Sequence, residues 1–156
     1  MYSLLNNQST PLMKKIMTDR TENASNGLEV VERLYDAFAR GDAAGIMAQL
    51  HDELDWNEAE NFMLSDRNPY RTPAAVADGV FRRLATDVRD YEATPTEIFD
   101  AGDVIVALGR SKGIIVATGK PFDAQYVHIW RVKSGKIIGF QQVIDTLNVW
   151  QAQQSA

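Results

Sequence analysis

The sequence contains no cysteine and only two histidines, His51 and His128, among its 156 residues. Without cysteine, the chain can form no disulfide bond, thiolate nucleophile or cysteine-ligated metal site. Two histidines are too few for a metal site built from several imidazoles, and no glycine-rich phosphate loop or HExxH motif is present. We therefore expect neither a bound metal nor another cofactor.

Long apolar runs and an excess of positive charge are also missing. No segment approaches the roughly 18 consecutive apolar residues of a membrane span. Residues 1–11 lack the basic and apolar regions of a signal peptide. The formal net charge is -5, whereas nucleic-acid-binding proteins carry basic patches or stripes. These absences predict a cytoplasmic protein that binds neither membranes nor nucleic acids.

The residues that are present suit one globular domain. A length of 156 residues is typical of a single domain, and the hydrophobic (45%) and charged (24%) fractions are ordinary. Residues 1–26 are mostly polar and are expected to form an N-terminal extension, either a short helix or a frayed tail. Residues 27–150 are expected to form the domain itself, and residues 151–156 a C-terminal tail.

Three helices are expected in the first half of the chain. Asn26 can cap the first helix, which Gly41 ends as a C-terminal glycine. Asp42 then begins a second, short helix. Thr72 and Pro73 fit the N-cap and the first residue of a third helix, which we expect to end near residue 85.

From Tyr91 onward, apolar and polar residues alternate with a period of two, which indicates strands. Ser134-Gly135 suits a two-residue hairpin turn. The helices and strands are segregated along the chain, and this order predicts an α+β fold. The expected strands are residues 54–59, 91–99, 103–111, 113–118, 123–133 and 136–146.

The strand over residues 123–133 is apolar on both faces. Tyr126 and Trp130 lie on one face, and Val127 and Ile129 lie on the other. The helices can cover only one of these faces. We therefore expect a partner subunit to cover the second face, giving a homodimer that packs through its sheets.

Five segments of the chain carry a family likeness. They are VERLYDAFARGD (31–42), LHDE (50–53), TPAAV (72–76), HIWRVKSGKI (128–137) and QQVIDT (141–146). With them, residues 30–150 resemble the nuclear transport factor two-like superfamily, in particular its SnoaL-like and ketosteroid-isomerase-like branch. The resemblance implies a cone-shaped, curved mixed or antiparallel sheet, wrapped around helices that enclose a pocket for a small organic ligand. It also implies a dimer.

The resemblance places three candidate catalytic residues. Glu58 falls where ketosteroid isomerases carry their aspartate base, and burial in an apolar pocket would raise its pKa toward neutrality. His128 falls near the acid that donates a hydrogen bond to the oxyanion in those enzymes. Asp145 is expected on the last strand, where SnoaL-like cyclases carry an acid–base aspartate. The alternatives are a solvated Glu58, a His128 bonded to a backbone carbonyl and an Asp145 that caps the backbone.

Five further residues are expected to line the pocket. Trp56, Trp130 and Tyr126 share faces with Glu58 and His128. A two-residue turn at Ser134-Gly135 would pair His128 with Gln141, which would then face the pocket as well. Tyr35 is expected in the core or in the pocket wall, because Leu34 rather than Tyr35 aligns with the family's oxyanion tyrosine.

Two functions remain open from the sequence. One is a cofactor-free acid–base enzyme, an isomerase, cyclase, dehydratase or hydrolase acting on a small apolar or polyketide-like substrate. The other is a non-catalytic domain that binds a small ligand or serves as a dimeric interaction module. The superfamily contains both enzymes and non-catalytic domains, so the function has to be inferred from the residues of the pocket rather than from the fold.

Overall fold

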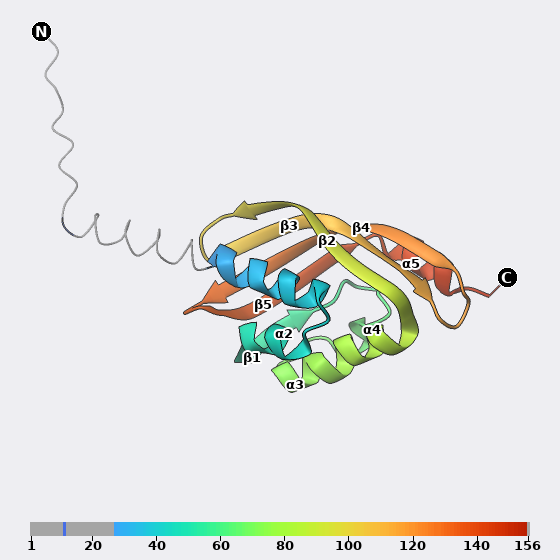
Figure 1. Cartoon of the computed structure of the whole chain (residues 1–156), viewed down its shortest axis with the longest axis horizontal. Helices are drawn as coiled ribbons and strands as arrows, with labels where there is room; N and C mark the ends of the chain where they lie inside the picture. Colours follow the sequence, from blue (N-terminus) through green and yellow to red (C-terminus); the bar gives the residue numbers. More distant parts are fainter. Residues whose placement is uncertain (1–10, 12–26, 156) are drawn as a thin grey trace, which may run out of the picture.

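The structure is a computed structural model that describes Pro11 and residues 27–155 (Figure 1). The expected N-cap at Asn26 and most of the N-terminal extension lie outside these residues. Residues 27–39 are helical. The elements that follow are α2 (Ala43–Gln49), β1 (Leu50–Asn57), η1 (Ser65–Arg67), α3 (Pro73–Val76), η2 (Ala77–Phe81), α4 (Arg82–Asp87), β2 (Val88–Asp100), β3 (Val104–Ile115), β4 (Pro121–Lys133), β5 (Lys136–Ile144) and α5 (Thr146–Gln153).

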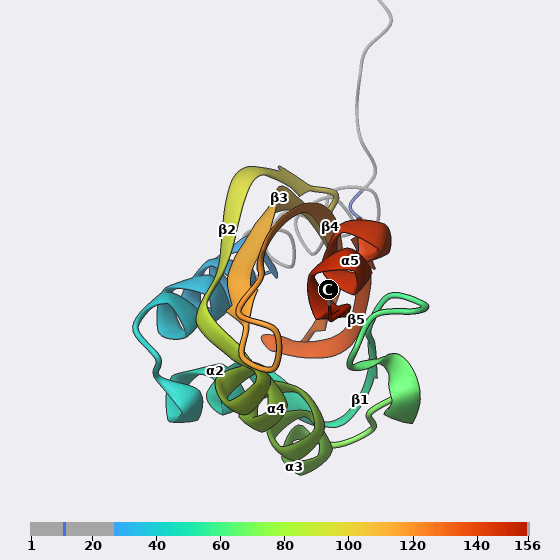
Figure 2. The ribbon, with the colours of Figure 1, turned by 90° about the vertical axis from the view of Figure 1, so that its right-hand side faces the viewer.

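The five strands form one curved sheet in the order β1-β5-β4-β3-β2. β1 runs parallel to β5, and the other neighbours are antiparallel. Figure 2 shows the sheet curling into an open ring, with α2, α3 and α4 lying across the gap between β2 and β1. The predicted α+β fold with a curved mixed sheet around helices is confirmed. Among the described residues, no helix is long and apolar enough to cross a membrane.

The turn between the first two helices follows the predicted signals. Gly41 has a φ of 67°, and its N–H donates to the carbonyl of Phe38 while that of Asp42 donates to Ala37. This pair of bonds is the Schellman motif, which favours glycine at the position with positive φ. Asp42 then caps α2 by accepting from the N–H of Gly45 at 2.8 Å. The turn fixes the position of Phe38 relative to α2.

The third helical stretch runs without a break from residue 73 to residue 87, through α3, η2 and α4. Thr72 caps it as predicted, accepting from the N–H of Ala75 at 3.1 Å. Its middle turn, η2, is π-helical. At Gly79 a β-carbon would come within 2.2 Å of the ring of Tyr70. Glycine there lets the helix approach Tyr70 closely.

Two expectations about the strands are wrong. A break was expected at Gly113, but β3 is continuous from Val104 to Ile115, and Gly113 pairs with Phe122. A β-carbon at Gly113 would lie 2.3 Å from Val88, so this glycine serves close packing rather than a turn. The last strand ends at Ile144 instead of residue 146, and α5 follows it across the expected boundary at residue 150.

A β-bulge in β5 decides which residues face the helices. Val132 pairs with Ile137, but Arg131 pairs with Gly139, so Ile138 is the extra residue. Beyond the bulge, His128 pairs with Gln142 rather than with Gln141. Because side chains alternate between faces, this shift of one residue turns Gln142 inward and Gln141 outward.

Burial alternates along β3 and β4, which separates an inner face from an outer face. The inner side chains of β4, including Tyr126, His128 and Trp130, are buried against the helices. The outer face is also apolar, but its side chains stay half-buried or exposed. They are Val106, Leu108, Val127, Ile129, Ile138 and Val143.

Gly109 on β3 is predicted to be essential for the shape of the inner face. A β-carbon there would lie 2.3 Å from the backbone oxygen of Thr94 and 2.5 Å from the ring of Tyr126. Because the backbone oxygen cannot move away easily, Gly109→Ala should lower the free energy of unfolding by at least about 2 kcal/mol in urea denaturation.

Gly139→Ala is the matched control for this substitution. Its β-carbon would meet only the side chain of Arg131, at 3.3 Å, so the loss should stay below about 1 kcal/mol. Equal losses in the two variants would contradict the explanation.

Candidate functional site

A cavity lies between the inner face of the sheet and the helices. The space open to the centre of a water molecule is about 40 Å³, which is room for roughly two or three waters. The residues that line it include five with polar groups, Tyr35, Glu58, Tyr91, His128 and Gln142, but the lining surface is mainly apolar. Its aromatic walls include Trp56, Phe62, Phe81, Trp130 and Phe140.

Glu58 directly follows β1 and is 3% exposed. The indole N–H of Trp56 donates to Glu58 Oε1 at 2.7 Å. The side chain of Asn68 holds the backbone on both sides, accepting from the N–H of Glu58 at 3.0 Å and donating to its carbonyl at 2.8 Å. Burial raises the pKa of Glu58 to about 7, although the bond from Trp56 opposes the shift. Glu58 is therefore poised to gain or lose a proton near neutrality.

His128 lies on β4 and takes part in a hydrogen-bond chain. Trp130 Nε1 donates to Tyr35 Oη at 3.3 Å, and Tyr35 Oη lies 2.7 Å from His128 Nδ1 in a hydrogen bond whose direction depends on the imidazole tautomer. When Tyr35 donates to Nδ1, the proton of the neutral imidazole sits on Nε2. Nε2 is buried and has no hydrogen-bond partner among the described residues.

The same burial keeps the imidazole and the neighbouring phenols uncharged. Desolvation lowers the pKa of His128 to about 3 and raises that of Tyr126 to about 12. It also raises the pKa values of Tyr35 and Tyr91 above their ordinary range. Near neutral pH, Glu58 is thus the cavity's group that titrates.

The structure brings several of the predicted site residues together. Glu58, His128, Trp56, Trp130 and Tyr35 all line the cavity. Tyr126 does not line it. Its ring stacks against that of His128, with centroids 3.8 Å apart and planes at 13°, so it supports the imidazole from one side.

Two predicted residues lie elsewhere. Gln141 is exposed, and Gln142 takes its place in the lining because of the bulge in β5. Asp145 is exposed at the N-terminus of α5, where it accepts from the N–H of Asn148 at 3.1 Å. It is the N-cap of a helix and does not lie on a strand, which matches the backbone-capping alternative rather than the catalytic one.

The sequence analysis missed Tyr91 and Gln142. Tyr91 lies on β2, lines the cavity and accepts from the hydroxyl of Ser111 at 3.0 Å. The feature of the sequence that could have indicated Tyr91 is its position at the start of the alternating apolar and polar pattern. Gln142 accepts from the N–H of Ala59 at 3.3 Å, but its orientation depends on a bulge that leaves no local mark. No group of three or more potential metal ligands occurs within residues 27–155.

The fold is an open, curved sheet whose inner face and helices enclose a small cavity. Residues 31–140 match the family model for the SnoaL-like domain. The chain therefore belongs to the SnoaL-like family, as the sequence motifs predict. Among proteins with curated descriptions, none matches this chain.

Solved structures agree with this assignment. An NTF2-like protein from Burkholderia thailandensis E264 is 36% identical, covers 81% of this chain and 95% of its own, and has a TM-score of 0.78. TerC co-crystallised with polyporic acid is 20% identical, with coverage of 81% and 97% and a TM-score of 0.73. A protein of ketosteroid isomerase-like fold from Catenulispora acidiphila DSM 44928, in complex with trimethylamine, is 14% identical, with coverage of 82% and 94% and a TM-score of 0.68.

The raised pKa of Glu58 predicts a pH-dependent stability. The carboxyl ionises near pH 4.5 in the unfolded chain and near pH 7 in the folded one. The folded state therefore holds more protons in this window, and the contribution of Glu58 to stability falls as the pH rises. Glu58→Gln keeps an acceptor for Trp56 but cannot ionise. Its free energy of unfolding, relative to the unmodified protein, should rise by about 3 kcal/mol between pH 4.5 and 7.

Urea denaturation of both proteins across this pH range gives the difference directly. A difference that does not change with pH would mean that Glu58 ionises in the folded protein as it does in water.

Proposed function

We propose that the protein catalyses cofactor-free proton transfer on a small, apolar carbonyl compound. Glu58 is the base, and the Nε2–H of His128 donates a hydrogen bond to the carbonyl oxygen. The observation that carries this proposal is that two residues line one aromatic cavity, Glu58 with a carboxyl pKa of about 7 and His128 with a buried Nε2 that has no hydrogen-bond partner among the described residues. The proposal assigns the imidazole proton to this Nε2. A general base works best when its pKa is near the working pH.

The proposed reaction needs no other reactant. Glu58 removes a proton from the carbon next to the carbonyl, and the electrons of the broken C–H bond form the enolate. The negative oxygen is stabilised by the N–H donor that Tyr35 and Tyr126 hold in place, in surroundings from which the aromatic walls exclude water. In a β,γ-unsaturated ketone, protonated Glu58 then returns the proton to the γ-carbon of the dienolate, which gives the conjugated isomer. Alternatively, the enolate carbon attacks a second carbonyl, and the alkoxide that forms takes the proton from Glu58, which gives a cyclised product.

The comparisons support a small organic ligand in this pocket. TerC holds polyporic acid and the Catenulispora acidiphila protein holds trimethylamine, so the fold accommodates small molecules. Asp145 has no part in the proposed reaction, because it lies outside the cavity at the start of α5.

Proton exchange at carbon tests the proposal. The protein should accelerate the exchange of α-protons for deuterium in a panel of small enolisable ketones, followed by NMR. Its kcat/KM should rise with pH to a plateau, with an apparent pKa of about 7. Glu58→Gln should lower kcat/KM by roughly 10²–10⁴-fold, whereas Glu60→Gln, an exposed glutamate two residues away, should leave it unchanged.

An unchanged rate in Glu58→Gln would contradict the assignment of the base. Binding of the panel compounds without any exchange would instead favour a non-catalytic ligand-binding domain. The observation that favours this second function is that Glu58 and His128 are both held by hydrogen bonds from within the protein.

We also propose that two copies of the chain form a homodimer through the outer face of the sheet. The apolar side chains of this face remain half-buried or exposed, and Val143 is 53% exposed. Such a patch has the composition of an interface, because burying it in a second copy removes apolar surface from water.

Sedimentation equilibrium tests the dimer. The unmodified protein should have twice the mass of the 17.4 kDa chain. Val143→Asp should weaken association at least roughly 30-fold, because it buries an unpaired charge in the interface. Val116→Asp is the matched control, since Val116 is 57% exposed but lies beyond the end of β3. Monomers at micromolar concentration, or equal effects of both substitutions, would contradict the proposed interface.

A further inference from the structure

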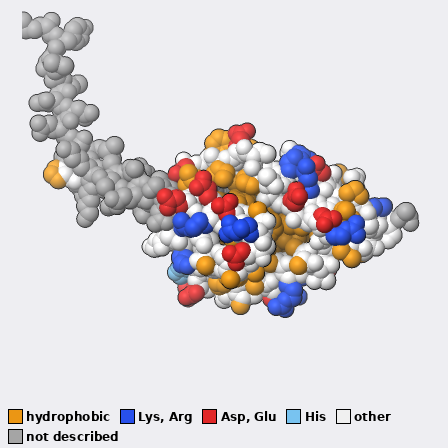
Figure 3. Space-filling model, in the orientation of Figure 1, with side chains coloured by type: hydrophobic (Ala, Val, Ile, Leu, Met, Phe, Trp, Pro, Cys, Tyr) orange, Lys and Arg blue, Asp and Glu red, His pale blue; other side chains and the backbone are white. Residues whose placement is uncertain are grey.

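An apolar groove on the surface adjoins the buried cavity. It has a volume of about 340 Å³ and lies between α2, α4 and the start of β2. Its floor and sides include Ala43 and Ile46 from α2, Leu84 and Ala85 from α4, and Val88 from β2. Figure 3 shows hydrophobic side chains gathered in the middle of this face, among charged ones.

Four side chains line both the cavity and the groove, namely Phe38, Phe81, Leu84 and Tyr91. The rings of Phe38 and Phe81 lie 5.9 Å apart, and those of Phe38 and Tyr91 lie 5.8 Å apart. Phe81 also contacts Trp56 inside the cavity, with centroids 5.8 Å apart. The cavity and the groove therefore adjoin each other at these side chains.

The sizes and polarities of the two spaces differ. The cavity, at about 40 Å³, is far smaller than the roughly 300–1,000 Å³ of ordinary ligand pockets, whereas the groove reaches that range. The cavity contains Glu58, His128 and Gln142. Among the described residues that line the groove, none carries a charge.

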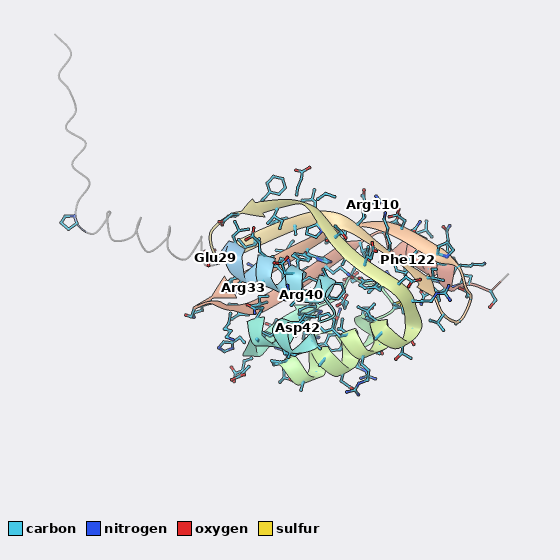
Figure 4. The ribbon with its side chains drawn as sticks, viewed as in Figure 1. Glu29, Arg33, Arg40, Asp42, Arg110 and Phe122 are labelled. Atoms are coloured by element: carbon cyan, nitrogen blue, oxygen red, sulfur yellow. The ribbon has the colours of Figure 1, made fainter. Side chains whose placement is uncertain are left out.

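Charged side chains stand beside the groove rather than in it. Arg40 and Asp42 flank Gly41, which lines the groove, and their charged groups lie 3.9 Å apart (Figure 4). Glu29 and Arg33 form a similar exposed pair on the first helix, about two to three turns before Arg40. These charges pair with each other, so the groove itself offers only apolar surface to a ligand.

We propose that the natural ligand has two parts, a compact carbonyl head that occupies the cavity and an uncharged, apolar tail that lies in the groove between α2 and α4. Phe38 and Phe81 contact the junction of the two parts. The identity of the head rests on the proposed function, whereas the tail rests on the groove alone. The substrate class is thus a small enolisable ketone with an extended hydrocarbon substituent.

A series of methyl ketones tests the tail. Acetone matches the compact carbonyl head, and 2-pentanone, 2-heptanone and 2-nonanone add tails of increasing length. Calorimetry on the full chain should show a Kd that falls by about three- to fourfold for each methylene that enters the groove. Affinity that does not change with tail length would overturn the proposal.

Substitution in the groove locates the tail. Ala85→Glu places a charge in the groove and should abolish the dependence on tail length while leaving the Kd of acetone itself unchanged. Ala74→Glu is the matched control, an exposed alanine of the same helical stretch that does not line the groove. It should keep the full dependence. A dependence that persists in Ala85→Glu would overturn the placement of the tail.

Two further readouts separate this inference from the others. Sedimentation of Ala85→Glu should give the mass of the unmodified protein, whereas a changed mass would mean that a second copy covers the groove and would overturn the proposal. The exchange assay with ketones tests the head separately. Tail-dependent binding without exchange would support the tail site in the groove and contradict the proposed catalysis. Exchange without a dependence on tail length would support the catalysis and contradict the tail site.

Discussion

The hydrogen-bond chain from Trp130 through Tyr35 to His128 is the interaction on which the site depends. It joins the first helix to β4. In the tautomer that the proposed reaction uses, the phenol accepts from the indole and donates its one proton to Nδ1. The stacked ring of Tyr126 supports the imidazole from the side. That tautomer has a buried, uncharged donor at Nε2, in surroundings where an imidazolium would be costly.

Desolvation acts on the two titratable groups of the cavity in opposite senses. It keeps His128 neutral by lowering the pKa of the imidazole to about 3. It keeps Glu58 protonated at acidic pH by raising the pKa of the carboxyl group to about 7. One physical cause therefore yields a donor that does not titrate and a carboxyl group that titrates near neutrality. Trp56 limits the shift of Glu58 by donating to its carboxylate, so the carboxyl group can still ionise.

The sequence predicted the parts of the fold that local chemistry determines. Gly41 and Thr72 mark helix ends through their own backbone and side-chain requirements, and both were found where expected. The bulge at Ile138 depends on packing across strands, so it left no mark in the sequence, and Gln141 was chosen instead of Gln142. Glu58 and His128 were found through family likeness, but the bond between Tyr35 and His128 joins residues 93 positions apart, a separation that periodicity cannot reveal.

For the proposed reaction, the aromatic walls impose two opposing requirements: the raised pKa of Glu58 needs a small, dry cavity, whereas a substrate needs space. The pKa of Glu58 is raised because Trp56, Phe81 and their neighbours exclude water from the carboxyl group. A cavity large enough for a bulky substrate would admit water in the absence of that substrate and would return the pKa toward 4.5. In the proposed mechanism, a small cavity keeps the base poised, and the larger part of the ligand binds outside it. The apolar groove, which shares Phe38 and Phe81 with the cavity, would hold that part without hydrating Glu58.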